Sequence, residues 1–460
     1  MLPKLIPVLG WALLLSACST TPPYQAPKLP ATANAFKETG LWHTANPQAA
    51  AVPDDWWQLF NDPVLNGLQT QVGQNQNLLA SAAQIRVAQA ALGSSRAALS
   101  PTLGAGLTAT RSASPTSPAA NSVALTGSAS WELDLWGRLS GAVTGDQARV
   151  QASQDDLAAA RLSLQATVAQ TYFSLRAAEA QSALLERSMQ AYQRSLELTQ
   201  NRYQGGVASA DDVAQAQTQL KTTSAQRIES DSSRAQLEHA LAVLLGLAPS
   251  EFSLPRTAAL PNTPEVPDQL PANLLERRPD IAAAERRVAA AYAQIGVAKA
   301  AFFPALTLSA SAGYKGSGLA NLVSAPNLLW SVGPALALAA FDGGLRQSNV
   351  DSARASTDAA TASYRQTVLT ALQEVEDNLV VAGSLQQEAA LQTEALAAAN
   401  RSLEIVKNQY QSGTVSYLNV VVAQATALSS ERSLLDVQNR RLAATNQLLK
   451  NIAGRWNAPS

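Results

Sequence analysis

The chain has 460 residues, a formal net charge of −1 at pH 7 and only 15% charged residues. It lacks the basic surplus that is typical of nucleic-acid-binding proteins, so we expect no nucleic-acid partner. One cysteine and two histidines leave almost no ligands for zinc sites, disulfides or cysteine–histidine catalysis, and we expect no metal site.

The first 17 residues have the features of a secretory signal peptide. Lys4 precedes an apolar stretch that is too short to span a bilayer as a helix, which takes about 20 residues. The run Leu15-Ser16-Ala17-Cys18 resembles the bacterial lipobox, which implies cleavage before Cys18 and attachment of an S-diacylglycerol and an N-palmitoyl group to that residue. An ordinary signal peptide with an incidental cysteine is the alternative. Ser19 follows in place of Asp, which by similarity to lipoprotein sorting favours the outer membrane of a Gram-negative bacterium.

The remaining sequence contains an internal duplication. Residues 92–103 match residues 295–306, and residues 201–207 match residues 408–414. Each copy predicts the order helix, strand, strand, long helix, turn, helix. The predicted division of the chain is a signal peptide at 1–17, an extended lipidated segment at 18–55, a first repeat at 56–248, a Pro-rich linker at 249–271 and a second repeat at 272–455.

Four strands are predicted, at about 102–114, 121–136, 305–316 and 328–341, the last being the least clearly marked. Apolar residues alternate in them with Ser, Thr and Gly, the pattern of a strand with lipid on one face and water on the other. A half-buried strand of a soluble sheet has the same pattern. Four strands cannot close a membrane barrel, and open sheet edges cannot face lipid. If these strands span a membrane, several chains must share one barrel.

A helix-forming run follows the second strand. From 141 to 204 no proline interrupts it, which corresponds to about 95 Å of helix. A seven-residue apolar seam runs through it and recurs in the second copy, which predicts a left-handed supercoil. Helices of this length must build a tube or a stalk.

Four motifs place these features in one family: Trp56-Trp57-Gln58-Leu59-Phe60-Asn61-Asp62, Leu274-Leu275-Glu276-Arg277-Arg278-Pro279-Asp280-Ile281, Phe302-Phe303-Pro304 and Phe341-Asp342-Gly343-Gly344. The chain resembles the TolC-like outer-membrane efflux proteins, and more narrowly their lipoprotein (NodT/OprM-type) branch, from about residue 50 to 455. The resemblance implies a homotrimer of mixed fold class, whose twelve-stranded membrane β-barrel continues into a long periplasmic α-helical barrel. It also implies an exit duct that works with a periplasmic adaptor and an inner-membrane pump in antibiotic resistance, without a cofactor.

The resemblance also places a periplasmic gate at the tips of the two helix hairpins, near the predicted turn residues Gly206 and Gly413. Tyr410 and Asp212 match positions that, in a well-studied relative, form a hydrogen bond holding the inner hairpin closed. Asp211 and Asp212 also lie in the first helical turn after the glycine, where the helix dipole favours acidic side chains, so a purely structural role is an equal alternative.

The gate departs from the family pattern in its charges. Relatives often carry carboxylates in the second hairpin, whereas the matching positions here are Asn419 and Val422. A basic partner present in some relatives would fall on Val415 or Ala425. We therefore expect an apolar closed gate built from Leu418 and Val422, with weak charge selection.

Two other classes of protein compete with this interpretation. An enzyme would need chemistry from Glu132, Asp134, His239 or the acidic group Glu374/Glu376/Asp377, and none of these lies in a nucleophile, metal or phosphate motif. A periplasmic lipoprotein scaffold or adaptor with coiled-coil hairpins would need a single hairpin flanked by other domains, not two copies with strand pairs. We expect neither.

Overall fold

The computed structural model describes residues 24–27, 55–264 and 278–452. Contacts between residues divide the chain into two compact units. Among the described residues, we call 24–27, 82–155 and 282–367 the strand unit, and 55–81, 156–264, 278–281 and 368–452 the hairpin unit. Cys18 lies outside the described residues.

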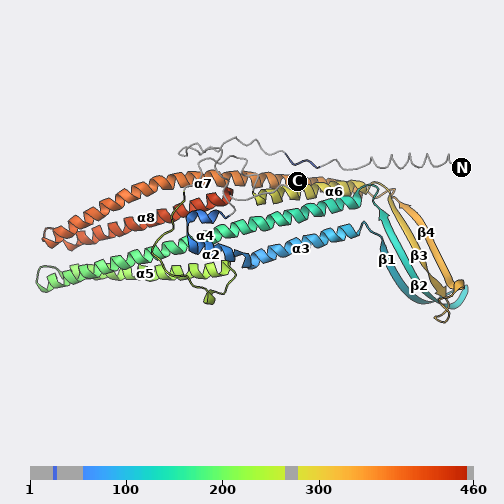
Figure 1. Cartoon of the computed structure of the whole chain (residues 1–460), viewed down its shortest axis with the longest axis horizontal. Helices are drawn as coiled ribbons and strands as arrows, with labels where there is room; N and C mark the ends of the chain where they lie inside the picture. The colour runs from blue at the N-terminus through green and yellow to red at the C-terminus, as the bar shows by residue number, and fades with distance from the viewer. Residues whose placement is uncertain (1–23, 28–54, 265–277, 453–460) are drawn as a thin grey trace. The chain divides into compact units, whose positions relative to one another are not determined.

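The described elements repeat one order, a helix, two strands, a very long helix and a shorter helix (Figure 1). None of the described helices combines the length and apolar character that crossing a bilayer requires. The elements are η1 (Trp56–Phe60), α2 (Pro63–Gln71), η2 (Val72–Gln74), α3 (Gln76–Ala97), β1 (Thr102–Ser114), β2 (Ser117–Leu133), α4 (Arg138–Gln204), α5 (Ala210–Leu244), η3 (Pro249–Glu251), α6 (Pro279–Ala300), β3 (Ala305–Gly316), η5 (Ala325–Asn327), β4 (Leu328–Ala337), α7 (Leu345–Gln411) and α8 (Tyr417–Ile452).

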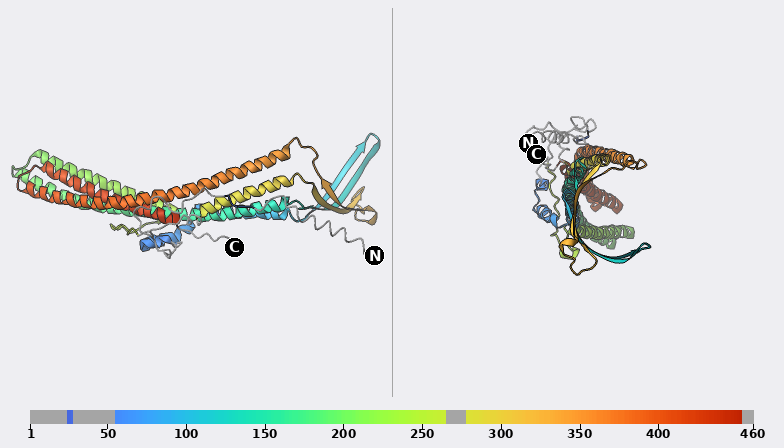
Figure 2. Two further views of the ribbon diagram at one scale, coloured as in Figure 1. Left: turned by 90° about the horizontal axis from the view of Figure 1, so that it is seen from above. Right: turned by 90° about the vertical axis from the view of Figure 1, so that its right-hand side faces the viewer.

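The strand unit contains one antiparallel sheet in the order β1-β2-β3-β4. The second strand begins at Ser117, before the predicted start, because a tight turn joins it to β1. It ends at Leu133, before the predicted 136, and β4 ends at Ala337, before the predicted 341. In both cases the chain leaves the sheet to form the cap of the following helix. Figure 2 shows the twist of the four strands from two further directions.

The register gives the sheet two chemically different faces. Leu107, Leu125, Tyr314 and Leu328 lie directly opposite one another in one row, so their side chains share a face. The same face carries Leu103, Ala105, Ala129, Trp131, Leu133, Leu306, Leu308, Ala310, Ala312, Trp330, Val332 and Leu336. The other face carries Thr102, Gly104, Gly106, Thr108, Thr126, Ser128, Ser130, Thr307, Ser309, Ser311 and Ser331. We call these the apolar face and the polar face.

The junction from β2 to α4 shows why the strand stops where it does. The Asp134 carboxylate accepts hydrogen bonds from the backbone N–H groups of Leu139 and Ser140, at 2.9 and 2.8 Å, and so caps α4. Burial opposes ionisation of Asp134, but the hydrogen bonds from Ser140 and the neighbouring backbone outweigh burial and lower its pKa. Trp136 stacks on Phe303 with ring centroids 4.8 Å apart and donates to the Pro304 carbonyl, which accounts for one family motif.

The junction from β4 to α7 repeats this arrangement. The Asp342 carboxylate accepts from the N–H groups of Gly344 and Arg346 and forms an ion pair with the Arg346 guanidinium. That guanidinium lies 5.3 Å from the centre of the Phe302 ring. The motif Phe341-Asp342-Gly343-Gly344 is therefore a helix-capping motif.

The core of the hairpin unit forms where η1 and α2 pack on the middle of α4. Trp56, Phe60 and Leu65 are almost completely buried against Phe173, whose ring centroid lies 4.7 Å from that of Phe60. The Asp62 carboxylate caps α2 and also accepts a 2.6 Å hydrogen bond from the Tyr172 hydroxyl. These contacts explain the first family motif, whose aromatic residues fill the core.

A buried ion network ties α4 and α5 to the segment after α5. Glu179 accepts from Arg176 at 2.6 Å and from Arg234 at 3.0 Å, and all three side chains are at most 8% exposed. Arg234 also pairs with Glu238 at 2.6 Å and donates to the Leu254 carbonyl at 2.6 Å. Both carboxylates of this network, Glu179 and Glu238, are paired, whereas the Arg176 Nε atom has no partner among the described residues. Removing one partner of such a buried network would leave the others unpaired.

In both repeats, a side chain at the start of the helix before the strand pair bonds to the end of the helical hairpin, through different groups. In the first repeat, the Asn75 side chain caps α3 and donates to the Leu244 carbonyl at 2.8 Å. In the second, Arg278 pairs with Asp280 and Glu374, at 2.8 and 2.9 Å, and donates to the Asn451 side chain at 3.4 Å. The motif Arg278-Pro279-Asp280 thus anchors the start of α6 against α8.

Candidate functional site at the hairpin tips

The two hairpins of the hairpin unit turn through the same local structure. Gly206 and Gly413 both adopt the left-handed conformation, with φ values of 72° and 76°. The N–H of the next residue donates back across the turn, from Val207 to the Arg202 carbonyl and from Thr414 to the Gln409 carbonyl. Both predicted turn residues therefore lie where α4 and α7 end, in a motif that glycine favours.

The predicted acidic residues lie at the start of α5, where both take part in local hydrogen bonds. Ser209 and Asp212 form a reciprocal capping box, with distances of 3.0 Å to the Ser209 Oγ atom and 2.9 Å to the Asp212 Oδ2 atom. Asp211 accepts from the Gln215 side chain at 2.6 Å. Asp211 and Asp212 therefore have the structural role at the start of a helix that was the alternative to a gate role.

The two hairpins meet in a small aromatic core that we call the tip cluster, formed by Leu196, Ala216, Tyr410, Tyr417 and Val420. The Tyr410 and Tyr417 rings meet edge to face with centroids 5.3 Å apart. The Tyr417 hydroxyl lies 3.2 Å from the Ser195 hydroxyl of α4. Burial raises the pKa of Tyr417, so this hydroxyl stays protonated.

Arg202 adds a charged contact to the tip cluster. Its guanidinium lies 4.8 Å from the centre of the Tyr410 ring, and its Nη1 atom donates to the Gln411 carbonyl at 3.3 Å. The sequence did not identify Arg202, Tyr417 or Ser195. Arg202 lies in one of the two segments that match between the repeats. Its contact with Tyr410, about two hundred residues away, could not be read from any local pattern.

The hydroxyl of Tyr410 is buried and has no hydrogen-bond partner among the described residues. Within one chain, therefore, Tyr410 does not form the predicted hydrogen bond with Asp212. The capping box of Asp212 uses its Oδ2 atom, and its Oδ1 atom takes no part in that motif. A bond between neighbouring chains stays a prediction.

The other residues predicted to form the gate lie at the start of α8, turned away from the tip cluster. Tyr417 and Val420 are buried, whereas Leu418 and Val422 are 53% and 57% exposed. Asn419 is also exposed. Helical periodicity explains the division, because residues one position apart point to different sides of the helix.

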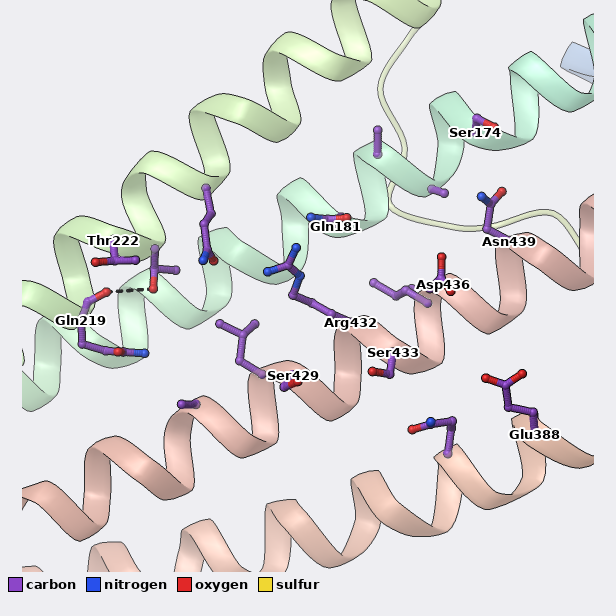
Figure 3. A pocket seen from close by; sticks show the side chains of 18 residues that line it. Ser174, Gln181, Gln219, Thr222, Glu388, Ser429, Arg432, Ser433, Asp436 and Asn439 are labelled. Carbon is purple, nitrogen blue, oxygen red and sulfur yellow. Dashed lines mark hydrogen bonds between the residues drawn. The ribbon is translucent and has the colours of Figure 1, made fainter. Parts of the chain in front are cut away.

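A polar pocket of about 790 Å³ lies farther from the turns, between α4, α5, α7 and α8. Figure 3 shows Arg432 extending from α8 toward Gln181 of α4. Hydroxyl and amide groups dominate the lining of the pocket. The two acidic residues of the lining, Glu388 and Asp436, pair with Arg440 at 2.9 and 3.4 Å. The lining contains no nucleophile activated by a neighbouring base. Within 24–27, 55–264 and 278–452, no cluster of three or more His, Cys, Asp or Glu residues is suited to a metal ion.

Residues 68–247 and 270–454 match the family described as "Outer membrane efflux protein". The chain belongs to the outer membrane efflux protein family. It is 30% identical over 455 residues to the antibiotic efflux pump outer membrane protein ArpC of Pseudomonas putida, covering 97% of this chain and 94% of ArpC.

Solved structures of outer-membrane channels agree with this assignment. The outer-membrane channel OprN is 29% identical and superposes with a TM-score of 0.88, over 95% of this chain and 100% of that one. The MtrE channel of Neisseria gonorrhoeae, solved in an open state, is 27% identical with a TM-score of 0.84, over 95% and 98% of the two chains.

Membership of the outer membrane efflux protein family confirms the resemblance that the four motifs indicated. The protein is an outer-membrane exit duct for efflux and not an enzyme. The alternative of a periplasmic scaffold is wrong, because both repeats match the channel family across nearly their whole length.

Proposed function

We propose that three copies of this chain form the exit duct of a tripartite efflux pump, with a periplasmic adaptor and an inner-membrane pump as partners. The two-faced sheet carries this proposal. Its outer strands β1 and β4 each have a neighbour on one side only, and unpaired strand edges cannot face lipid. Three sheets supply twelve strands, enough to close a barrel with the apolar face toward lipid and the polar face toward water.

The size of the assembly tests the duct. Protein extracted in mild detergent from outer membranes is expected to migrate as a trimer and to fall to monomer size on heating. Reconstitution in planar bilayers is expected to give ion-conducting channels. A folded, membrane-inserted monomer would refute the shared barrel.

The cargo that we propose is small organic compounds, including antibiotics. ArpC is named for antibiotic efflux, and the chain is similar to it over nearly its full length. In this proposal the duct conducts passively, as a path for the compounds that the pump delivers. The energy for export comes from the pump at the inner membrane.

The tips of the hairpins form the gate in this proposal. A buried tyrosine hydroxyl without an acceptor costs free energy, and the Tyr410 hydroxyl is in that state within one chain. In the closed duct we propose that the Tyr410 hydroxyl turns out of the tip cluster, and that the Oδ1 atom of Asp212 from a neighbouring copy, with Asp211 beside it, then accepts its hydrogen bond. Leu418 and Val422, exposed on α8, narrow the aperture together with Asn419.

Tyr410→Phe is expected to open the duct. The change removes one hydroxyl and keeps the ring that packs on Tyr417 and Arg202. A hydrogen bond to a charged partner contributes roughly 1.5–3 kcal/mol, which corresponds to about a ten- to hundredfold shift toward the open state. Single-channel conductance and sensitivity to bulky antibiotics such as vancomycin are both expected to rise.

Tyr203→Phe provides the matched control, because Tyr203 precedes Gly206 in the first hairpin by three residues, as Tyr410 precedes Gly413 in the second, and it is 50% exposed. It is expected to leave conductance unchanged. The same rise in both variants would contradict a specific gate bond.

The proposed apolar aperture leads to a separate prediction about block of the channel by cations. Because Asn419 and Val422 stand where relatives carry carboxylates, trivalent cations are expected to block the channel poorly from the periplasmic side. Val422→Asp is expected to create such a block. Tight block of the unaltered channel would assign the aperture to Asp211 or Asp212 instead.

We also propose that the mature chain is anchored by a lipid on Cys18, the S-diacylglycerol and N-palmitoyl groups of a bacterial lipoprotein. Cys18→Ser is expected to abolish labelling by a fatty-acid tracer. Part of the exported protein is expected to remain in the membrane, because the strands hold it there independently of the acyl chains, which contribute roughly 0.8 kcal/mol per buried methylene. Absence of label on the unaltered protein would end the lipid proposal without touching the duct.

A further inference from the structure

Charges are rare on the sheet, and the register assigns each of them to a face. The strands β1 to β4 contain only three charged residues, Arg111, Glu132 and Lys315. Lys315 lies opposite Ala124, which lies opposite Thr108, so Lys315 is on the polar face. Arg111 lies opposite Asn121, two residues beyond Ala109 on the same strand, and is therefore on the apolar face.

Glu132 is the other charge on the polar face, and it is neutralised. Arg138 at the start of α4 binds it through two parallel hydrogen bonds of 3.0 and 2.7 Å, from Nε to Oε1 and from Nη2 to Oε2. Asp342 is likewise paired with Arg346, whereas backbone N–H groups of α4 hold the Asp134 carboxylate without cancelling its charge. Asp134 lies past the end of β2, so the strands themselves end in a neutral ion pair on the polar face.

Lys315 differs from Glu132 in both place and pairing. Its side chain is exposed and has no hydrogen bond or ion pair within the described chain. Lys315 is paired with Ala124 of β2, and Glu132 lies eight residues farther along the same strand. This separation corresponds to roughly 26 Å. Lys315 is near the end of β3, at the side of the sheet where turns join β1 to β2 and β3 to β4. Neither of these turns contains a charged residue. Lys315 is thus the one uncompensated charge on the polar face of the described strands.

We infer that Lys315 makes the strand-lined part of the duct select for anions. The inference rests on the proposed trimer, in which three copies of the polar face line the water-filled lumen and three Lys315 side chains form a ring in its outer half. Rings of Lys or Arg favour anions in pores. Exported compounds that carry a carboxylate, phosphate or sulfate group are drawn through this section, and cationic compounds are disfavoured there.

Ion selectivity in planar bilayers tests the ring. Under a KCl gradient at low ionic strength, the reversal potential of the full-length channel is expected to show anion preference, which weakens as salt screens the ring. Lys315→Glu is expected to shift the reversal potential to cation preference, and Lys315→Gln to an intermediate value. The glutamine variant keeps the test valid if three facing glutamates hinder assembly.

Arg111→Glu is the matched control, because it makes the same change of charge in the same sheet but on the apolar face. It is expected to leave the reversal potential unchanged. As a second measurement, tripolyphosphate added on the side of the strand turns is expected to reduce the current through the unaltered channel and to lose this effect in Lys315→Gln.

The outcomes separate this inference from the proposed duct. The inference alone would be overturned if the unaltered channel, Lys315→Gln and Lys315→Glu all conduct with the same reversal potential and the same block by tripolyphosphate. A protein that assembles no conducting channel would overturn the duct itself.

Discussion

Leu107→Arg is expected to prevent stable assembly of the channel in the membrane. Leu107 lies near the middle of β1 and opposite Leu125 on the apolar face, and it is 63% exposed in the single chain. A charge on the lipid face costs about 2–4 kcal/mol near the bilayer midplane and about 0–1 kcal/mol near its edges. In a trimer this cost recurs in every chain, so the amount of heat-dissociable trimer in outer membranes should fall sharply.

Thr108→Arg is the control for this prediction, because Thr108 is the adjacent residue on the polar face. It is expected to assemble. Leu103→Arg, on the apolar face but four residues nearer the helices, is expected to have an intermediate effect, since the cost falls toward the membrane edge. Equal loss of trimer from Thr108→Arg and Leu107→Arg would contradict the assignment of the faces.

Arg234→Ala is expected to destabilise the hairpin unit by about 3–5 kcal/mol, because removing one member of a buried ion network leaves its partners unpaired in a poorly solvated place. Glu238 loses its 2.6 Å contact, Glu179 loses one of its two arginines, and the Leu254 carbonyl loses its donor. The midpoint of denaturant unfolding, followed by the helical circular dichroism signal, is expected to shift accordingly.

Arg187→Ala gives the comparison for Arg234→Ala. Arg187 pairs with Glu431 at 2.9 Å, but its side chain is 62% exposed, and exposed ion pairs contribute about 0–1 kcal/mol. Each variant removes an arginine side chain from an ion pair, and the two arginines differ in how deeply they are buried. Similar unfolding midpoints for both would show that the buried network adds little to stability.

The strands were predictable from the sequence because side-chain alternation has a period of two and the faces of this sheet differ strongly. Thr102–Ser114 and Ala305–Gly316 agree with the expected ranges. The ends of β2 and β4 were less predictable, since Asp134 and Asp342 cap helices through backbone contacts that interrupt an apolar run. Alternation continues in the sequence past the point where the hydrogen-bonded ladder stops.

The structure of the hairpin tips was predictable only in part. Gly206 and Gly413 are recognisable because each follows a long helical run, and the spacing of Ser209 and Asp212 is that of a capping box. The contact of Arg202 with Tyr410 depends on how two hairpins pack, which periodicity within either hairpin does not encode. The buried Tyr410 hydroxyl has no hydrogen-bond partner among the described residues, a fact that no pattern in the sequence indicates.

The two unpaired edges of the sheet have a genetic consequence. Each chain contributes one third of a closed wall in the proposed trimer, so no copy can compensate for a faulty neighbour. A variant that still docks through one sound edge, β1 or β4, would incorporate into mixed channels and disable the normal chains beside it. Loss-of-function alleles that spare one edge should therefore be dominant over the normal gene, whereas alleles that destroy both edges should be recessive.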